Sequence, residues 1–200
     1  MEAKNNCRMQ QKASEAKAVL RRQIRAALAR MSVDQKAIAS ESARTLLAQQ
    51  RVWQDAKTVL FFAPLTDELD LFPMIEMALK GGKAAALPRF VEEKGSYTAG
   101  RVDDVSQQIK IGHFNVREPE PNCGEVELNR LDLILVPGVA FDLHGRRLGR
   151  GKGFYDQMLA AVRGTTCGVA FEEQIVREVP FEPHDIQLNC ILTPTRWVEL

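Results

Sequence analysis

The chain has 200 residues, of which 45% are hydrophobic and 26% charged, and its formal net charge is +1. This length and composition are typical of one soluble globular domain whose core needs no disulfides or metals to hold it together. The near-zero net charge argues against non-specific nucleic-acid binding, so we expect no nucleic-acid partner and look for basic charge that is local.

The four cysteines, at positions 7, 123, 167 and 190, are far apart, with no C-x-x-C pair and no histidine at ligand spacing. The pattern indicates neither a zinc site nor a disulfide framework and favours reduced thiols in the cytoplasm. Residues 1–11 are polar, and no apolar segment is long enough for a signal peptide or a membrane span. We therefore expect a flexible extension over residues 1–13, a single domain over 14–200, a cytoplasmic location and no membrane partner.

Two helices are predicted first. Residues 14–31 place Leu20, Ile24 and Leu28 on one apolar stripe, and Lys17 falls near the centre of that stripe, with Arg21 at its edge. Lys17 has two interpretations: a long side chain that reaches solvent past the end of the core, or a phosphate contact inside a cleft. The second helix, over 32–50, opens with the capping-box pattern of Ser32 and Gln35.

A short apolar strand over 58–63 ends at Pro64, and acidic residues follow it at Asp67, Glu68 and Asp70. In an open α/β sheet, ligands bind outside the carboxyl ends of the strands, which is where these acids would lie. Capping of a helix over 70–80 is the alternative role for them, although it accounts more easily for one acid than for three.

The remaining pattern alternates strands and helices. Strands are predicted over 83–88, 131–136, 166–171 and 190–193, and helices over 153–162 and 172–178, whereas glycines and prolines divide 91–129 into hairpins and loops. Residues 131–136 are nearly all apolar, as in a strand buried on both faces of a parallel sheet. We therefore predict a three-layer α/β/α domain with a mostly parallel, doubly wound sheet.

The loop G-R-R-L-G-R-G-K-G, residues 145–153, contains four glycines and four fixed cations within nine residues. Two like charges about 6 Å apart repel by roughly 3 kcal/mol at an effective dielectric of 20, so this crowding favours a bound anion such as phosphate. The glycines let the backbone approach a ligand closely, and a following helix would direct its N-terminus to the same point. The loop matches neither G-x-x-x-x-G-K-[ST] nor G-x-G-x-x-G.

Asp156, three residues after the last glycine of the loop, is at odds with a phosphate site unless a divalent cation bridges the two. We therefore expect Mg²⁺ together with a nucleoside triphosphate. The alternative is that Asp156 only complements the N-terminus of the following helix.

The stretch F-D-L-H-G-R-R-L-G-R-G-K-G-F-Y-D, preceded by D-L-I-L-V-P-G-V-A, resembles the signature of the 5-formyltetrahydrofolate cyclo-ligase family. K-A-V-L-R, D-E-L-D, L-P-R-F and P-F-E-P-H-D are similar to further family segments, so the resemblance covers most of the chain. Leu71, Phe114 and Phe154 stand where many members have Thr, Trp and Tyr, and residues 1–13 have no counterpart.

The resemblance implies a set of site residues. ATP would be held by Lys17, Arg21, Arg147, Leu148, Gly149, Arg150, Gly151, Lys152, Gly153, Phe154 and Tyr155. The reduced formyl folate would contact Ala63, Glu68, Phe114, Arg150, Gly151, Lys152, Gly153 and Phe154, and Mg²⁺ would be bound by Asp156 and Asp185. Lys152 and Arg150 are our choices for stabilising the transferring phosphoryl group.

The reaction that the resemblance implies is the ATP- and Mg²⁺-dependent closure of 5-formyltetrahydrofolate to 5,10-methenyltetrahydrofolate by a monomeric enzyme. Phosphorylation of the formyl oxygen would make it a leaving group, which asks the protein mainly for positioning and charge neutralisation. The alternative function is a non-catalytic protein that uses the same loop to bind a nucleotide or an RNA phosphate backbone.

Overall fold

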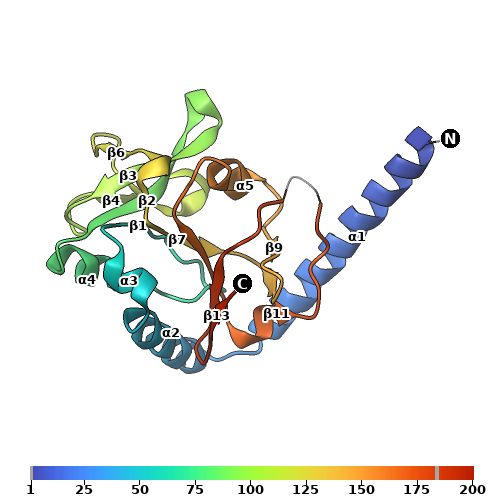
Figure 1. Ribbon diagram of the computed structural model, residues 1–200, viewed down its shortest axis with the longest axis horizontal. Coiled ribbons are helices and arrows are strands. Elements are labelled where there is room, and N and C mark those ends of the chain that lie inside the picture. Colours follow the sequence, from blue (N-terminus) through green and yellow to red (C-terminus); the bar gives the residue numbers. More distant parts are fainter. Residues whose placement is uncertain (1, 183–184) are drawn as a thin grey trace.

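The computed structural model describes residues 2–182 and 185–200, which form an eight-stranded sheet with helices around it (Figure 1). Five adjacent strands are parallel: β12 (Cys190–Leu192), β10 (Thr165–Val169), β7 (Leu133–Pro137), β1 (Thr58–Leu60) and β2 (Ala84–Val91). Antiparallel strands complete both edges: β13 (Trp197–Glu199) beside β12, and β3 (Ser96–Val102) followed by β6 (Glu125–Val126) beside β2. The predicted α/β fold with a mostly parallel sheet is confirmed.

Strand β1 lies between the two halves of the parallel sheet. Val59 is in register with Ala85 of β2 on one side and with Leu133 of β7 on the other. The chain adds β2 outward from β1 in one direction and then β7, β10 and β12 in the other. The carboxyl ends of β1 and β7 therefore mark the topological switch point, where ligands bind in open sheets of this kind.

Alternate residues of the central strands enter two separate cores. Val59 and Leu133 belong to the larger core, which also contains residues of α1 (Glu2–Leu28), α2 (Val33–Ala48), α3 (Arg51–Asp55) and α4 (Met74–Lys80). Leu60 and Ile134 belong to a second core on the other face, with Met158 of α5 (Phe154–Leu159). The fully buried strand β7 supplies both cores, which explains its nearly unbroken apolar sequence.

The first two helices differ in how well the sequence predicts their ends. For α2, the capping box is confirmed: Gln35 N–H donates to Ser32 Oγ (3.1 Å) and Ser32 N–H donates to Gln35 Oε1 (2.8 Å). Helix α1 begins at Glu2, so it runs through the segment predicted as an extension, and it ends at Leu28, three residues before the predicted end. That residues 1–13 are flexible stays a prediction.

Smaller elements connect the sheet. Residues between β3 and β7 form the hairpin of β4 (Ile109–Ile111) and β5 (Arg117–Pro119), and a three-stranded sheet joins β8 (Ala140–Asp142), β9 (Arg147–Leu148) and β11 (Ile175–Val176). Single turns of 3-10 helix occupy Glu92–Lys94, His113–Asn115, Leu128–Arg130 and Glu172–Gln174. The helix predicted over 172–178 is thus a 3-10 turn followed by β11. No helix among the described residues is long and apolar enough to cross a membrane.

Gly164, directly before β10, packs against the backbone of the two residues that precede β7, and this close contact can be tested. A methyl group at this position would lie 2.1 Å from the carbonyl oxygen of Leu131 and 2.6 Å from that of Asp132, so the backbone itself would have to move. We expect Gly164→Ala to lower the free energy of unfolding by about 2 kcal/mol or more, measured by urea denaturation. Gly124→Ala is the matched control, because no atom lies within 4 Å of the added methyl, and it should change stability by less than about 0.5 kcal/mol. Equal losses in the two variants would contradict this account.

Candidate functional site

A cavity of about 340 Å³ opens at the switch point of the sheet. Phe62 and Ala63, which follow β1, and Pro137 and Gly138, at the end of β7, form its floor. Many of the residues predicted from the sequence line it: Ala63, Glu68, Phe114, Arg147, Gly149, Arg150, Lys152, Gly153, Phe154, Tyr155 and Asp156. Glu68, which follows the first strand, and the glycine loop, about 80 residues away in the chain, therefore meet at one site, whereas Asp70 accepts a hydrogen bond from the backbone N–H of Phe72 (2.9 Å) just before α4.

The glycine loop is anchored at its base by a buried acid that the sequence analysis did not single out. Asp142 Oδ1 accepts hydrogen bonds from the backbone N–H groups of His144 (2.9 Å) and Arg146 (3.1 Å), and its Oδ2 accepts one from Val179 (2.8 Å). Gly145 has φ +80°, and a methyl group there would lie 2.7 Å from the carbonyl oxygen of Leu188. Together these contacts fix the start of the loop against the core.

Carboxylates of the protein itself pair with three of the four cations in the loop. Arg146 Nη1 lies 3.0 Å from Glu178 Oε1. Arg150 Nη2 lies 2.6 Å from Asp67 Oδ1 and 2.8 Å from Glu68 Oε1. Arg147 Nη2 lies 2.6 Å from Asp156 Oδ1. The crowding of cations is therefore not by itself an argument for a bound anion, because the folded chain supplies counter-charges to these arginines. That the loop binds phosphate stays a prediction.

Lys152 differs from these arginines. No carboxylate of the described residues lies within ion-pair distance of its ammonium group, which instead lies 5.5 Å from the centre of the Phe114 ring. An aromatic face attracts a cation far less than a carboxylate does. Lys152 is therefore the loop cation that can take a new anionic partner without first breaking an ion pair.

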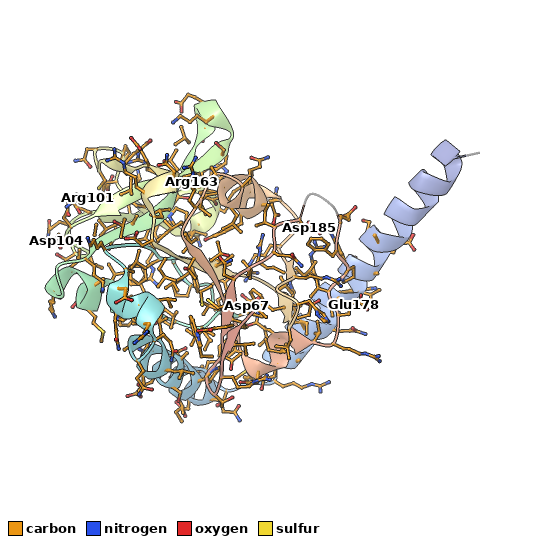
Figure 2. All side chains as sticks on the ribbon, viewed as in Figure 1. Asp67, Arg101, Asp104, Arg163, Glu178 and Asp185 are labelled. Carbon is orange, nitrogen blue, oxygen red and sulfur yellow. The ribbon has the colours of Figure 1, made fainter. Side chains whose placement is uncertain are left out.

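Helix α1 contacts the opposite side of the loop. Arg21 Nε donates a hydrogen bond to the carbonyl oxygen of Gly149 (2.9 Å). Lys17 forms ion pairs with Glu182 (2.7 Å) and Asp185 (3.0 Å), and Figure 2 shows Asp185 on the segment beside α1. Burial lowers the pKa of Lys17, but the two carboxylates outweigh it and leave this pKa raised. Lys17 therefore points inward, as its place on the apolar stripe suggests, and does not reach solvent past the core.

The two predicted metal ligands, Asp156 and Asp185, are on different sides of the loop. Asp156 lines the cavity and is paired with Arg147, whereas Asp185 is paired with Lys17. The described part of the chain contains no group of three or more His, Cys, Asp or Glu side chains that could hold a metal by themselves. Each is a carboxylate of the kind that Mg²⁺ takes, one or two at a time, while phosphate oxygens and water complete its shell, so the residues suit the metal by their chemistry and not as a preformed pair.

Aromatic rings form one wall of the cavity. Phe114 and Phe154 lie 5.8 Å apart between ring centres, and Tyr97 lies 5.6 Å from Phe154. Phe114 and Asn115 both have left-handed backbone conformations (φ +57° and +60°), which cost roughly 1–2 kcal/mol for a residue with a side chain. Strained backbone at the mouth of a cavity is typical of functional loops.

The helix after the loop is shorter than the sequence predicts. It covers Phe154–Leu159 in place of 153–162, and Gly153, with φ +71°, precedes it. With six residues it offers only a small dipole, so the case for anion binding depends on side chains and loop N–H groups. Tyr155 lies in the first turn of this helix and packs against the second core, and burial raises the pKa of its hydroxyl well above the ordinary range.

Three polar residues of the cavity wall lie in segments that the sequence analysis left as loops or hairpins: Tyr97, Arg117 and Glu118. The guanidinium of Arg117 lies 3.7 Å from the centre of the Phe72 ring, and Glu118 is 4% exposed. The sequence gives no signal for Tyr97. R-E-P at 117–119 could indicate a pocket lining but is more typical of a surface loop, and the structure places Arg117 and Glu118 at the cavity.

An open, mostly parallel sheet with a charged cavity at its switch point defines a ligand-binding α/β domain of the doubly wound class. Comparison with known proteins gives its family. The profile of the 5-formyltetrahydrofolate cyclo-ligase family matches residues 13–194, and the chain belongs to this family.

Individual relatives agree with this assignment. The chain is 30% identical over 196 residues to 5-formyltetrahydrofolate cyclo-ligase of Mus musculus, covering 90% of this chain and 94% of the relative. It is 33% identical over 149 residues to the protein of that name from Escherichia coli K12, covering 70% and 80%. Among solved structures, the NMR structure of 5,10-methenyltetrahydrofolate synthetase from Aquifex aeolicus has a TM-score of 0.84 and 32% identity, with 92% of each chain covered.

Glu68 gives the site a pH-dependent stability. Burial raises its pKa above 4.5, and the ion pair with Arg150 only partly offsets this. A carboxyl whose pKa is raised by folding stabilises the protein below the unfolded pKa, and this contribution is lost as the pH rises through the folded value. The difference in unfolding free energy, wild type minus Glu68→Gln, should therefore decrease as the pH is raised from 4 to 8. Urea denaturation at several pH values across that range measures it. A rising difference would show that the ion pair outweighs burial.

Proposed function

We propose that this protein catalyses the ATP- and Mg²⁺-dependent conversion of 5-formyltetrahydrofolate to 5,10-methenyltetrahydrofolate, with release of ADP and phosphate. The observation that carries the proposal is the convergence of the glycine loop, Glu68 and the aromatic wall on one cavity in a chain of this family. The reduced formyl folate is the small-molecule substrate of the cavity, and ATP is the co-substrate.

The two ligands occupy different sides of the glycine loop in this proposal. Phe114, Phe154 and Glu68 face the cavity and contact the folate, whereas Lys17 and Arg21 approach the loop from α1 and contact the nucleotide. Residues 147–155 lie between the two sides. The formyl oxygen and the terminal phosphate would then meet at the tip of the loop, where Lys152 and Arg150 stand.

The chemistry requires two successive displacements. The formyl oxygen attacks the terminal phosphorus of ATP and ADP leaves. The neighbouring folate nitrogen then attacks the formyl carbon, loses its proton, and expels phosphate together with the original formyl oxygen. An amide-like oxygen is a poor leaving group until it is phosphorylated, so the protein contributes mainly by positioning and by neutralising charge.

Asp156 and Asp185 would hold Mg²⁺, which neutralises charge on the transferring phosphoryl group when bound. Both carboxylates are paired with cations, Arg147 and Lys17. With Mg-ATP bound, Asp156 and Asp185 would be ligands of the metal, and Arg147 and Lys17 would pair with phosphate, so that no buried charge would be left without a partner.

Lys152 is the sharpest test of the cationic loop. We expect Lys152→Ala to lower turnover by more than about tenfold with an unchanged thermal unfolding transition, because it removes a positive charge that neutralises the transferring phosphoryl group. Formation of the methenyl chromophore with ATP is the measurement. Lys80→Ala is the control: Lys80 is exposed on α4, is paired with Glu76 and does not line the cavity, so its replacement should leave turnover unchanged. Wild-type turnover in Lys152→Ala would remove this residue from the reaction.

ADP formation with and without 5-formyltetrahydrofolate separates this function from its alternatives. The proposed enzyme releases ADP only when the folate is present. A nucleotide sensor would bind ATP with no folate-dependent release, and an RNA-binding protein would show an affinity for RNA that falls steeply with salt.

The metal ligands are tested by Mg²⁺ titration. We expect Asp156→Asn to raise the Mg²⁺ concentration that gives half-maximal activity by about tenfold or more, because a neutral amide is a much weaker ligand for a hard cation. Asp103→Asn, at an exposed acid paired with Arg101, is the control and should follow the wild-type titration. An unchanged Mg²⁺ requirement in Asp156→Asn would remove this residue from the metal site.

A further inference from the structure

Glu118 is the buried acid of the cavity for which the proposed reaction gives no role. It lies in β5 and is 4% exposed, and it lines the cavity beside Tyr97, Phe114 and Arg117. Its two oxygens have different surroundings. Oε2 accepts a hydrogen bond from the backbone N–H of Phe90 (3.3 Å), whereas Oε1 is buried and accepts none from any residue that the structure describes.

The fold around Glu118 keeps this carboxylate in place. Gly112 packs directly against it: a methyl group at position 112 would lie 2.5 Å from Glu118 Oε2. Burial raises the pKa of Glu118, and the backbone N–H groups of Phe90 and His113 and the more distant charges of His113 and Lys110 offset this only in part. A buried acceptor without a partner is costly, so a site that retains one is suited to a ligand that donates to it.

We propose that Glu118 Oε1 accepts a hydrogen bond from the 2-amino-4-oxopyrimidine end of the folate and thereby selects for that ring. This inference rests on the proposed function. The N3–H and the 2-amino group are adjacent donors on one edge of the ring, and a carboxylate is the acceptor that best matches such an edge.

The arrangement of charges in the cavity agrees with this orientation. Glu118 contacts Phe90 and Gly112, whereas Arg150 contacts Asp67 and Glu68 on a different part of the wall. In the bicyclic ring, the 2-amino group and the formyl-bearing nitrogen lie at opposite ends. A folate whose formyl group faces Arg150 of the glycine loop therefore directs its pyrimidine donors away from that end of the cavity, toward Glu118.

The test combines a variant with a substrate analogue. Glu118→Leu removes both oxygens, and 2-desamino-5-formyltetrahydrofolate carries hydrogen in place of the 2-amino group. We expect Glu118→Leu to weaken binding of 5-formyltetrahydrofolate by at least about tenfold, measured as Kd by calorimetry without ATP, with the KM for ATP unchanged. The wild type should bind the desamino analogue at least about tenfold more weakly than the natural substrate. For Glu118→Leu, the two compounds should differ in Kd by less than about threefold.

Glu120→Leu is the matched control, because Glu120 lies two residues further along, does not line the cavity and is paired with Lys110. It should bind both compounds as the wild type does. If Glu118→Leu does not fold, Glu118→Gln replaces it. The amide of Glu118→Gln has one carbonyl oxygen, which would have to accept from both the Phe90 N–H and the ligand. The ratio of Kd for the desamino analogue to Kd for the natural substrate should therefore be smaller in Glu118→Gln than in the wild type.

Equal penalties for the analogue in wild type and variant would overturn the role of Glu118, and so would a wild type that does not discriminate between the two compounds. The proposed function is judged separately by turnover. A wild type that binds the folate with the expected discrimination but forms no methenyl product retains the assignment of Glu118 and loses the proposed reaction.

Discussion

The ion pairs between the glycine loop and the acids that face it are the interactions on which the candidate site depends. Arg150 with Asp67 and Glu68, and Arg147 with Asp156, tie the glycine loop to the acids that follow β1 and to the helix that follows the loop. Arg147 is almost fully buried, and a buried cation without a counter-charge would be strongly destabilising. The loop can therefore be both cationic and stable before any ligand binds.

The ion pairs within the protein also reduce the affinity that the arginines can contribute to a bound phosphate. A phosphate that approaches Arg150 or Arg147 replaces a carboxylate already in contact, so the net gain is the difference between two ion pairs. Lys152 has no such partner among the described residues and gains the whole interaction. For this reason we give Lys152 the leading role at the phosphoryl group, and the arginines a role shared with their acids.

Sequence patterns predicted the parts of the structure that are local or periodic. The capping box of Ser32 gave the start of α2, and the apolar run of 131–136 gave the buried central strand β7. The long loop motif gave the family, and Glu68 and the loop do meet at one cavity. The order of the strands could not be predicted in this way, because it depends on which segments pair over long distances.

Glu118 and Asp142 show why the rest of the site was not predicted. Each is a single acid in a stretch without periodicity, and each acquires its role from contacts with distant backbone, Phe90 N–H for Glu118 and Val179 N–H for Asp142. Lys17 is an intermediate case. Helical spacing placed it on the inner face of α1, but its partners, Glu182 and Asp185, lie about 165 residues away in the sequence.

The glycine loop has two faces, and this supports the proposal that each face contacts a different ligand. Its backbone contacts α1 through Arg21 and Gly149, while the side chain of Arg150 points to the acids of the cavity. A cavity of about 340 Å³ lies near the lower end of the range for small-molecule sites, which suits a bicyclic ring. Lys17, Arg21 and Asp185 do not line the cavity, so a nucleotide that contacts them must lie on the α1 side. In the proposed function, the loop would then lie between the two ligands, and they would meet at its tip, where the phosphoryl group is transferred.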